Sequence, residues 1–221
     1  MTFSPEIVEL IKTGIWETLF MVFASSAISY AIGIPLGIIL VVTDKDGIRP
    51  FPIVQQVLGV IINLLRSIPF MILLIMVLPL TRAIVGTTLG AKAVVPPLVI
   101  AAAPYIARMV ESSFTEVDAG VIEAAKSMGA STFQIIWKVL LPEAKPSLLV
   151  GAAISITTIL GYSAMAGFTG GGGLGTIAIN YGYYRYQTDM MLLTVAILVI
   201  IVQIIQEVWM RLARVSDKRI R

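Results

Sequence analysis

Long runs of apolar residues without a charged side chain dominate the sequence. The first runs from Thr18 to Thr43, and its length exceeds the about 20 residues with which a helix crosses the hydrocarbon core of a bilayer. Later runs repeat this pattern, and only Arg66 interrupts the second one. The predicted spans cover residues 18–42, 53–80, 92–110, 147–167 and 188–210. The pattern therefore predicts an all-α integral membrane protein with five transmembrane helices in a single domain over residues 1–221.

The residues before the first run predict a separate short helix. A Ser-Pro-Glu sequence at residues 4–6 combines an N-cap, a proline in the first turn and an acid at the positive end of a helix. Ile7, Leu10 and Ile11 would share one apolar face, which favours a helix lying on the bilayer surface. The run that follows is too long for the apolar core of a signal peptide, so we expect an uncleaved span.

Composition supports a membrane protein and removes several kinds of chemistry. Hydrophobic residues make up 57% of the chain and charged residues 13%, and the mean hydropathy is +0.93, whereas soluble proteins carry about 25% charged residues. The sequence contains no cysteine and no histidine. It therefore lacks a thiolate metal site and the commonest general base. We expect no catalytic residue, no metal site and no cofactor bound by this chain.

The distribution of basic residues orients the five spans. Basic side chains collect on the cytoplasmic side of membrane proteins, and the bias is clearest with the C-terminus in the cytoplasm and the N-terminus outside. The cytoplasmic segments then hold Lys45, Arg49, Arg108, Lys126, Lys138, Lys145, Arg211, Arg214, Lys218, Arg219 and Arg221. The outer segments hold Lys12, Arg82, Lys92 and Arg185. Four tyrosines between residues 181 and 186 would form the aromatic belt at the outer interface.

The charged stretch between the third and fourth spans predicts two short amphipathic helices on the cytoplasmic side. Asp118 can cap the first helix. The apolar side of that helix would hold Val121, Ile122, Ala125 and Met128.

A glycine corner would join the two helices. Gly129 can end the first one in the left-handed conformation, and Ser131 with Gln134 has the spacing of a capping box that begins the second. Its apolar stripe would comprise Phe133, Ile136, Trp137 and Leu140, and Pro142 would then disturb it. These helices could rest on the bilayer surface as an elbow. Alternatively, they could dock into a groove of a cytoplasmic partner.

This cytoplasmic stretch resembles a known sequence motif. The matching positions are Glu123, Ala124, Ala125, Gly129, Val139, Leu141 and Pro142. They resemble the EAA loop in permease subunits of binding-protein-dependent ATP-binding-cassette importers, which usually has isoleucine where this chain has Val139. In that family the loop, here about residues 111–146, forms a coupling helix that seats in a cleft of the ATPase subunit. The resemblance therefore implies the docking interpretation.

The resemblance extends over nearly the whole chain. Residues 66–70, 103–108 and 161–165 and the glycine-rich turn before Tyr181 look like the permeases of methionine importers in that family. This implies the type I importer permease fold and methionine transport by alternating access in the bacterial inner membrane, with another polar amino acid as the alternative substrate. The implied partners are a second copy of the chain, two cytoplasmic subunits that use ATP and Mg, an extracytoplasmic methionine-binding protein and the lipid bilayer, but no nucleic acid.

Other functions find less support in the residues. Residues 170–175 fit G-x-G-x-x-G, but a dinucleotide site needs a preceding strand, and this run follows a membrane helix. The sequence has no P-loop pattern, so a partner would have to bind ATP.

An ion-coupled carrier usually has a carboxylate at mid-membrane, and the apolar runs contain none, although backbone carbonyls could still bind sodium. An integral-membrane enzyme lacks candidate residues.

Arg66 has two interpretations. A lone arginine near mid-bilayer costs about 2.5–3.5 kcal/mol on insertion scales, so we expect it to be paired or to face water. Asn63 shares its helix face, and Pro69 can kink the helix. In a structural role, Arg66 would bond carbonyls freed by the kink or meet the second copy of the chain. In a functional role, it would line the pathway and meet the substrate carboxylate.

The fourth span carries a second group of candidate pathway residues. Tyr162, Ser163 and Met165 place a polar face beside a thioether, which suits a path for a thioether amino acid. Small residues around them also permit ordinary helix packing. Because the resemblance places this span near the pathway, we expect these residues to line it, with Met165 as a candidate gate.

Overall fold

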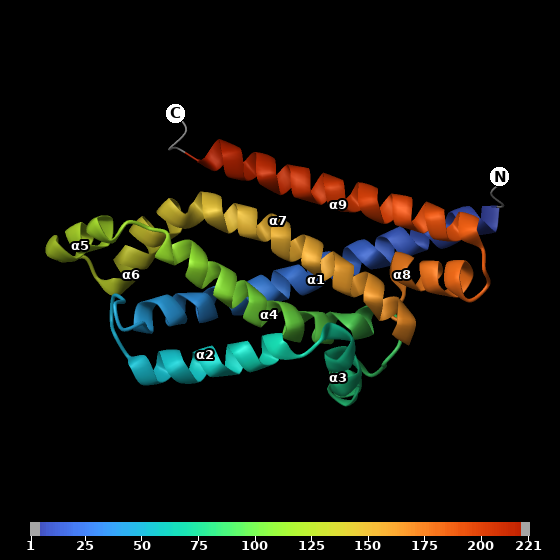
Figure 1. Cartoon of the computed structure of the whole chain (residues 1–221), viewed down its shortest axis with the longest axis horizontal. Helices are drawn as coiled ribbons and strands as arrows, with labels where there is room; N and C mark the ends of the chain where they lie inside the picture. Colours follow the sequence, from blue (N-terminus) through green and yellow to red (C-terminus); the bar gives the residue numbers. More distant parts are fainter. Residues whose placement is uncertain (1–4, 218–221) are drawn as a thin grey trace. The chain divides into compact units, whose positions relative to one another are not determined.

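The computed structural model describes residues 5–217, which are helical apart from short turns (Figure 1). The long helices are α1 (Pro5–Thr43), α4 (Ala91–Thr115), α7 (Leu141–Met165) and α9 (Thr188–Ser216). The shorter helices are α2 (Pro52–Ser67), α3 (Phe70–Val85), α5 (Ala119–Ser127), α6 (Thr132–Ile135) and α8 (Gly173–Ile177). No strand occurs between residues 5 and 217, so the predicted all-α class is confirmed.

Four segments of the described chain are long and apolar enough to cross a membrane, namely α1, α4, residues 132–169 and α9. The helices α2 and α3 form a bent pair and add a fifth span only if the pair crosses as one. The predicted kink at Pro69 is confirmed, and the count of five spans, with the second over residues 53–80, stays a prediction. The chain breaks at Ile68 because a residue before proline disfavours helical dihedrals. At the break, the Ser67 hydroxyl donates to the Asn63 carbonyl oxygen at 2.8 Å.

The predicted interfacial helix at the N-terminus is not a separate element. α1 continues from Pro5 to Thr43 and passes through Pro35, while the predicted N-cap Ser4 lies outside the described residues. Ile7, Leu10 and Ile11 pack against a buried cluster of the chain rather than forming a free apolar face. Internal packing therefore explains the apolar residues that the sequence assigned to the bilayer surface.

The chain divides into two compact units. Unit 1 comprises the described parts of residues 1–28, 68–102 and 156–206, and unit 2 those of residues 29–67, 103–155 and 207–221. The four long helices each contribute to both units, so the units are not consecutive domains along the chain.

The core of unit 1 forms where α1, α8 and α9 meet. Its buried centre is Leu174, Ile177 and Met190. The partly buried residues packed against that centre are Ile7, Leu10, Ile11, Ile15, Tyr181, Ile197, Leu198 and Ile201. A Cβ on Gly14 of α1 would lie 2.5 Å from the terminal methyl group of Ile177, so glycine permits the close packing at this point.

Two polar side chains of α1 satisfy the first amides of α8. The Gly173 N–H donates to the Glu17 carboxylate at 2.6 Å, and the Leu174 N–H donates to the Thr18 hydroxyl at 2.9 Å. Both amides lie at the start of a helix, where the backbone offers them no acceptor. Gly172 and Gly173 have φ of +79° and +72°, which side-chain-bearing residues rarely adopt. The glycine run that matched a nucleotide motif is therefore a tight turn fixed to α1.

The core of unit 2 brings α1, α2 and α4 together. Leu40, Ile62 and Ala107 are its buried centre. A Cβ on Gly37 of α1 would approach the Ala107 carbonyl oxygen to 2.6 Å. Such small residues allow close approach of membrane helices, where van der Waals packing replaces the hydrophobic effect as the driving force.

We predict that Glu17→Ala destabilises the protein measurably. The substitution leaves the buried Gly173 amide without its acceptor, which costs about 1–3 kcal/mol. Thermal unfolding of the purified protein in detergent would detect this as a lower midpoint temperature. Glu9→Ala is the matched control, because Glu9 forms only an exposed ion pair with Lys12 on the same helix. Equal midpoints for the two variants would show that the contact between α1 and α8 does not depend on Glu17.

Candidate coupling segment and polar network

The helix α5 begins and ends as its sequence predicts. The Asp118 carboxylate accepts from the Gly120 N–H at 2.7 Å. At the other end, the Gly129 N–H donates to the Lys126 carbonyl and the Ala130 N–H to the Ala125 carbonyl, which is the Schellman arrangement. Gly129 has φ of +76°, so its predicted left-handed conformation is confirmed.

The capping box after Gly129 is also confirmed. The Ser131 N–H donates to the Gln134 side-chain oxygen at 2.8 Å, and the Gln134 N–H donates to the Ser131 hydroxyl at 3.3 Å. Two orphan amides at the start of α6 are thereby satisfied. The corner between α5 and α6 is therefore fixed by local hydrogen bonds on both sides.

The predicted end of the second helix at Pro142 is wrong. A π-helical segment, Ile136–Leu140, joins α6 to α7, and residues 132–169 form one continuous candidate span. The Leu141 N–H reaches back five residues to the Ile136 carbonyl. The wider π turn gives the Pro142 ring room against the preceding carbonyls. What the sequence predicted as a second short helix is instead the start of a long one.

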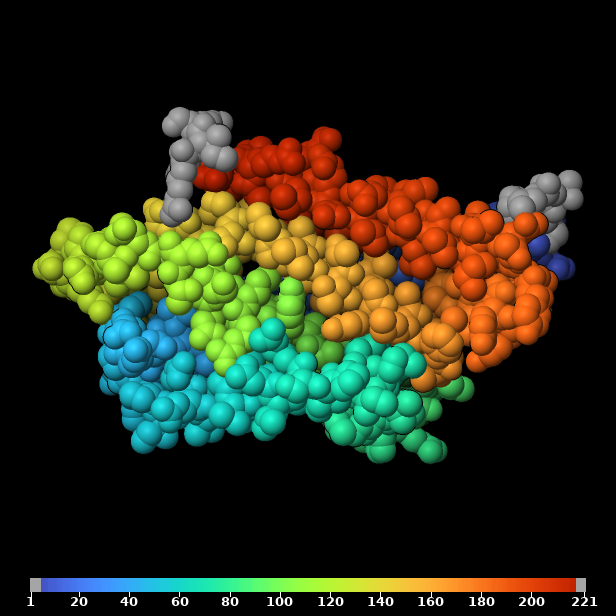
Figure 2. All heavy atoms as spheres, viewed as in Figure 1, coloured from blue at the N-terminus to red at the C-terminus, as the bar shows by residue number. Residues whose placement is uncertain are grey.

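The apolar residues of the candidate coupling segment, residues 118–140, differ in exposure. On α5, Ala125 is 4% exposed whereas Met128 is 81% exposed. After the corner, Ile135 and Leu140 are buried. The large apolar side chains that remain exposed are Val121, Met128, Phe133 and Trp137, which we term the exposed apolar set. Figure 2 shows the yellow-green spheres of α5 uncovered on the face drawn. The exposed apolar set is available to a partner surface.

Positions of the EAA-like motif divide into exposed and buried groups. Glu123 and Ala124 are exposed, and Ala125 is buried. Val139 and Leu141 are half-buried in the continuous helix, and Pro142 is exposed. Gly129 lies at the corner between α5 and α6 and is itself exposed. The motif therefore combines an outward surface with the residues that fix its orientation.

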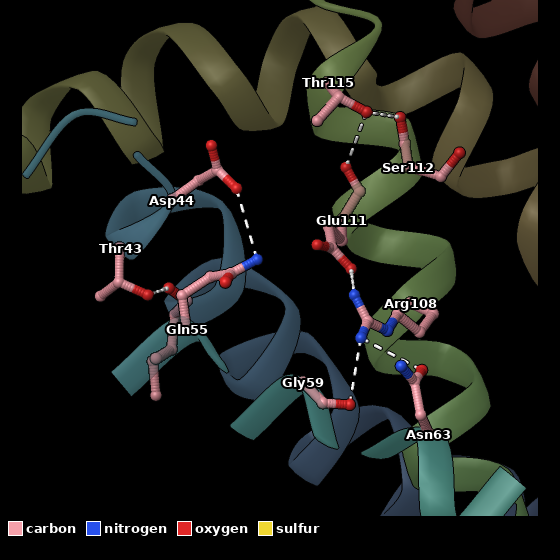
Figure 3. Close-up of polar contacts among 10 residues, drawn as sticks. Thr43, Asp44, Gln55, Gly59, Asn63, Arg108, Glu111, Ser112 and Thr115 are labelled. Carbon is pink, nitrogen blue, oxygen red and sulfur yellow. Dashed lines mark hydrogen bonds and ion pairs between the residues drawn. The ribbon is translucent and has the colours of Figure 1, made fainter. Parts of the chain in front are cut away.

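An arginine joins α4 to α2 within unit 2 (Figure 3). Arg108 Nη1 lies 2.7 Å from the Glu111 carboxylate, and Arg108 Nη2 donates at 3.1 Å to both the Gly59 carbonyl oxygen and the Asn63 side-chain oxygen. The side chains of Arg108 and Glu111 are 23% and 18% exposed. A Cβ on Gly59 would lie 3.1 Å from Nη2, so glycine permits this approach.

Sequence reasoning used Arg108 for orientation but missed its role in this network. The available signal was the (i, i+3) spacing of an arginine and a glutamate on one helix, which places them side by side. Nothing in the sequence indicates that Asn63 pairs with Arg108 instead of Arg66, because that depends on how α2 packs on α4.

Further hydrogen bonds connect the neighbouring helix ends in unit 2. The Gln55 side chain donates to the Asp44 carboxylate at 3.3 Å, which links the end of α1 to α2 (Figure 3). Lys126 on α5 lies 3.5 Å from the Gly47 carbonyl oxygen. These two contacts join the end of α1 to α2, and the turn after α1 to α5.

The structure places Arg66 in the last turn of α2, next to Tyr105. Its guanidinium carbon lies 5.9 Å from the centroid of the Tyr105 ring. A cation over an aromatic ring and a cation at a helix C-terminus are both favourable. Among residues 5–217, however, Arg66 forms no ion pair. Ser67, rather than Arg66, bonds the carbonyl at the helix break.

The three candidate pathway residues of α7 differ in their surroundings. The Tyr162 ring stacks on Phe70 at a centroid distance of 4.5 Å. Ser163 is 1% exposed, and its hydroxyl donates to the Leu160 carbonyl oxygen at 2.7 Å. Met165 is 45% exposed. Tyr162 and Met165 remain available to a ligand, whereas the hydroxyl of Ser163 is used inside its own helix.

Comparison with known proteins finds close relatives over nearly the whole chain. The family described as "Binding-protein-dependent transport system inner membrane component" matches residues 33–221. The probable D-methionine transport system permease protein MetI of Vibrio cholerae is 47% identical, and the alignment covers 96% of this chain and 94% of that protein. The corresponding protein of Pasteurella multocida is 44% identical, with 98% and 100% covered.

Solved structures give the same result. A chain of the MetNI methionine ABC transporter in an inward-facing conformation superposes with a TM-score of 0.95 at 44% identity, with 98% of this chain and 100% of that chain covered. An amino acid ABC transporter solved with histidines superposes with a TM-score of 0.77 at 20% identity, over 97% and 99% of the chains. The second similarity concerns the fold alone.

We predict that Arg108→Gln lowers the stability of the protein. It leaves the Glu111 carboxylate without its cation in a largely buried place, and removing one partner of such a pair costs about 1–3 kcal/mol or more. The stability of Arg108→Lys should lie between that of the unmodified protein and that of Arg108→Gln, because an ammonium keeps the charge but cannot reproduce the planar fork of the guanidinium. The measurement is the thermal unfolding midpoint in detergent.

The control for this prediction is Arg211→Gln, which removes an exposed pair with Glu207. We expect a much smaller change there, since exposed pairs contribute little. A midpoint for Arg108→Gln that matches the Arg211→Gln value would contradict a stabilising role of the network.

Proposed function

Because the chain belongs to the family of binding-protein-dependent transport system inner membrane components, we propose that it is the membrane-spanning subunit of an ATP-driven importer that carries methionine into the cell. The observation that supports this most strongly is the near-complete superposition on a methionine ABC transporter chain. The names of the MetI relatives support the same substrate. The chain serves as a transport subunit, and a separate partner hydrolyses ATP.

The assembly that we propose contains two copies of this chain, two cytoplasmic ATP-binding subunits that use ATP and Mg, and an extracytoplasmic methionine-binding protein. We place the C-terminus and the coupling segment in the cytoplasm and the N-terminus outside, because this orientation gives the cytoplasm most of the basic residues. The similarity to an inward-facing transporter supports the proposal that this chain is in a conformation that opens to the cytoplasm.

The coupling segment is our proposed contact with the ATP-binding subunit. Exposed Glu123 and Ala124 and the exposed apolar set would enter a groove of that subunit, as an amphipathic helix does in its receptor. Buried Ala125 and half-buried Val139 and Leu141 would hold the segment on the membrane helices, and Pro142 would lie at the start of α7.

Transmission of movement follows from the continuity of the helices. α5 is joined to α6 by the hydrogen-bonded corner at Gly129, and α6 continues into α7. Closure of the ATP-binding subunits would therefore displace α7 together with the coupling segment. Alternating access then results from a two-state dimer whose outward state is favoured by ATP and whose inward state returns after hydrolysis.

We propose a pathway that includes Arg66 and Asn63 on α2 and Tyr162 and Met165 on α7. Met165 is the candidate gate because its flexible thioether is exposed and can repack around a passing side chain. Ser163 contributes as a small packing residue rather than as a ligand, since its hydroxyl is already bonded.

The test is reconstitution of the chain with its ATP-binding subunit in liposomes. Uptake of labelled methionine should require ATP and the loaded binding protein together. Gly129→Leu should reduce this uptake roughly fivefold to thirtyfold, because a left-handed residue with a Cβ costs about 1–2 kcal/mol and the corner would change its angle. Gly129→Asn should retain most uptake, since asparagine tolerates this conformation.

Gly86→Leu provides the matched control. Gly86 ends α3 with φ of +84°, and, as at Gly129, no atom lies within 4 Å of an added Cβ. Both variants therefore carry the same backbone strain, but only Gly129 lies in the coupling segment. Equal loss of uptake in the two leucine variants would contradict a specific coupling role. Absence of ATP-dependent methionine uptake by the unmodified assembly would contradict the proposed function itself.

A further inference from the structure

A cavity of about 320 Å³ opens in unit 2 beside Arg66. Its wall comprises Arg66, Tyr105, Arg108, Met109, Ser112, Ser113, Glu116, Ser147, Val150, Gly151 and Ile154. The α4 residues recur at the three- and four-residue spacing of one helix face, as do those of α7. The cavity is therefore a groove between one face of α4 and one face of α7, with Arg66 added by the last turn of α2.

The groove has a charged end and an apolar wall. Arg66 and Tyr105 lie together at one end. Ser113 follows Tyr105 by eight residues, or about 12 Å along the axis of α4, and Glu116 comes just after the end of that helix. The Ser113 and Ser147 side chains hydrogen bond at 3.0 Å in the part between these ends. Met109, Val150 and Ile154 supply the apolar surface.

Arg66 is the cation of this groove that has no anionic partner among residues 5–217. Arg108 is already paired with Glu111 and bonded to α2. Arg66 has only the ring of Tyr105 among the described residues, and such a contact is worth about 0.5–1 kcal/mol at an exposed site. A guanidinium in an apolar membrane segment is costly unless an anion meets it. The site therefore has an unused preference for a carboxylate or a phosphate.

On the basis of the proposed function, we propose that the groove holds the transported amino acid during passage. The Arg66 guanidinium binds its carboxylate, the Tyr105 hydroxyl accepts from its ammonium group, and its thioether side chain packs on Met109 and Ile154, with Ser112 lining the groove beside it. The volume lies at the lower end of the range for small-ligand sites, which suits a single amino acid. Arg66 thereby selects substrates with a free carboxylate, and the apolar wall accepts an uncharged side chain.

The chain contains no cysteine, so a single introduced thiol can report on occupation of the groove. The experiment uses Ser112→Cys in the complete permease–ATPase complex, in nanodiscs of neutral lipid. The rate of modification by a charged methanethiosulfonate is measured on this chain with methionine or methioninol, which lacks the carboxylate. Methionine at about three times its Kd should slow the reaction about fourfold, as simple competition requires. Methioninol should have little effect.

Arg66 variants then test the assigned contact. Arg66→Gln in the Ser112→Cys background should abolish the protection by methionine, and Arg66→Lys should retain part of it, because the charge remains without the planar fork. Arg82→Gln on α3 is the matched arginine control and should leave the protection unchanged. A thiol at exposed Thr13, made by Thr13→Cys, should react at the same rate with and without methionine.

The proposal would be overturned by protection that persists in Arg66→Gln, by equal protection by methioninol, or by protection of the thiol by anionic lipid in place of methionine. The last outcome would assign the groove to a lipid phosphate. Methionine uptake by the same preparations separates this proposal from the proposed function. Normal uptake by the unmodified complex without protection of Ser112→Cys would refute the groove site alone.

Discussion

Satisfaction of backbone polar groups inside the chain is the constraint on which this structure depends. Hydrocarbon offers no hydrogen bonds, so a membrane chain must remain helical or supply local partners wherever it departs from a helix. The break after α2 has the Ser67 hydroxyl, and the turn before α8 has Glu17 and Thr18 from α1. These two departures are each paired with specific side chains, and backbone hydrogen bonds close other turns, such as that from the Gly90 N–H to the Gly170 carbonyl oxygen.

Helix continuity is the feature of the structure on which the proposed coupling role depends. α4 extends to Thr115, and the helix that starts after Gly129 continues without interruption into the membrane. The Arg108 network joins α4 to α2, and the glycine corner fixes α5 on α6. A displacement imposed on the exposed apolar set would therefore reach α7 through the continuous helix, and the turn after α1 through the contact of Lys126 with Gly47.

The sequence predicted those features that depend on neighbouring residues. Asp118, Gly129 and the Ser131–Gln134 capping box act within a few residues of themselves, and each has the predicted geometry. Features that depend on packing were predicted less well. The pairing of Asn63 with Arg108 is set by how whole helices lie on one another.

Prolines have different effects along this chain, and Pro142 is the one that led to a wrong element boundary. Pro35 lies inside α1 without ending it, in line with the predicted first span, and Pro142 lies two residues after a π turn that accommodates its ring. Ile68 and Pro69, in contrast, do separate two helices. Sequence pattern alone treats these prolines alike, because the difference lies in whether the surrounding turns can satisfy the carbonyls that a proline leaves unbonded.

From the continuity of residues 132–169, we infer that α6 and α7 move as one rigid helix through the π segment. The direct measurement is the distance between spin labels at Gln134→Cys and Ile154→Cys, with one labelled copy in each assembly, in nucleotide-free and ATP-bound states. Twenty residues of helix place these positions about 30 Å apart, and the account predicts the same distance in both states. A change of about 5 Å or more, which is one helical turn, would show that the segment bends at Ile136–Leu140 and would contradict the claim.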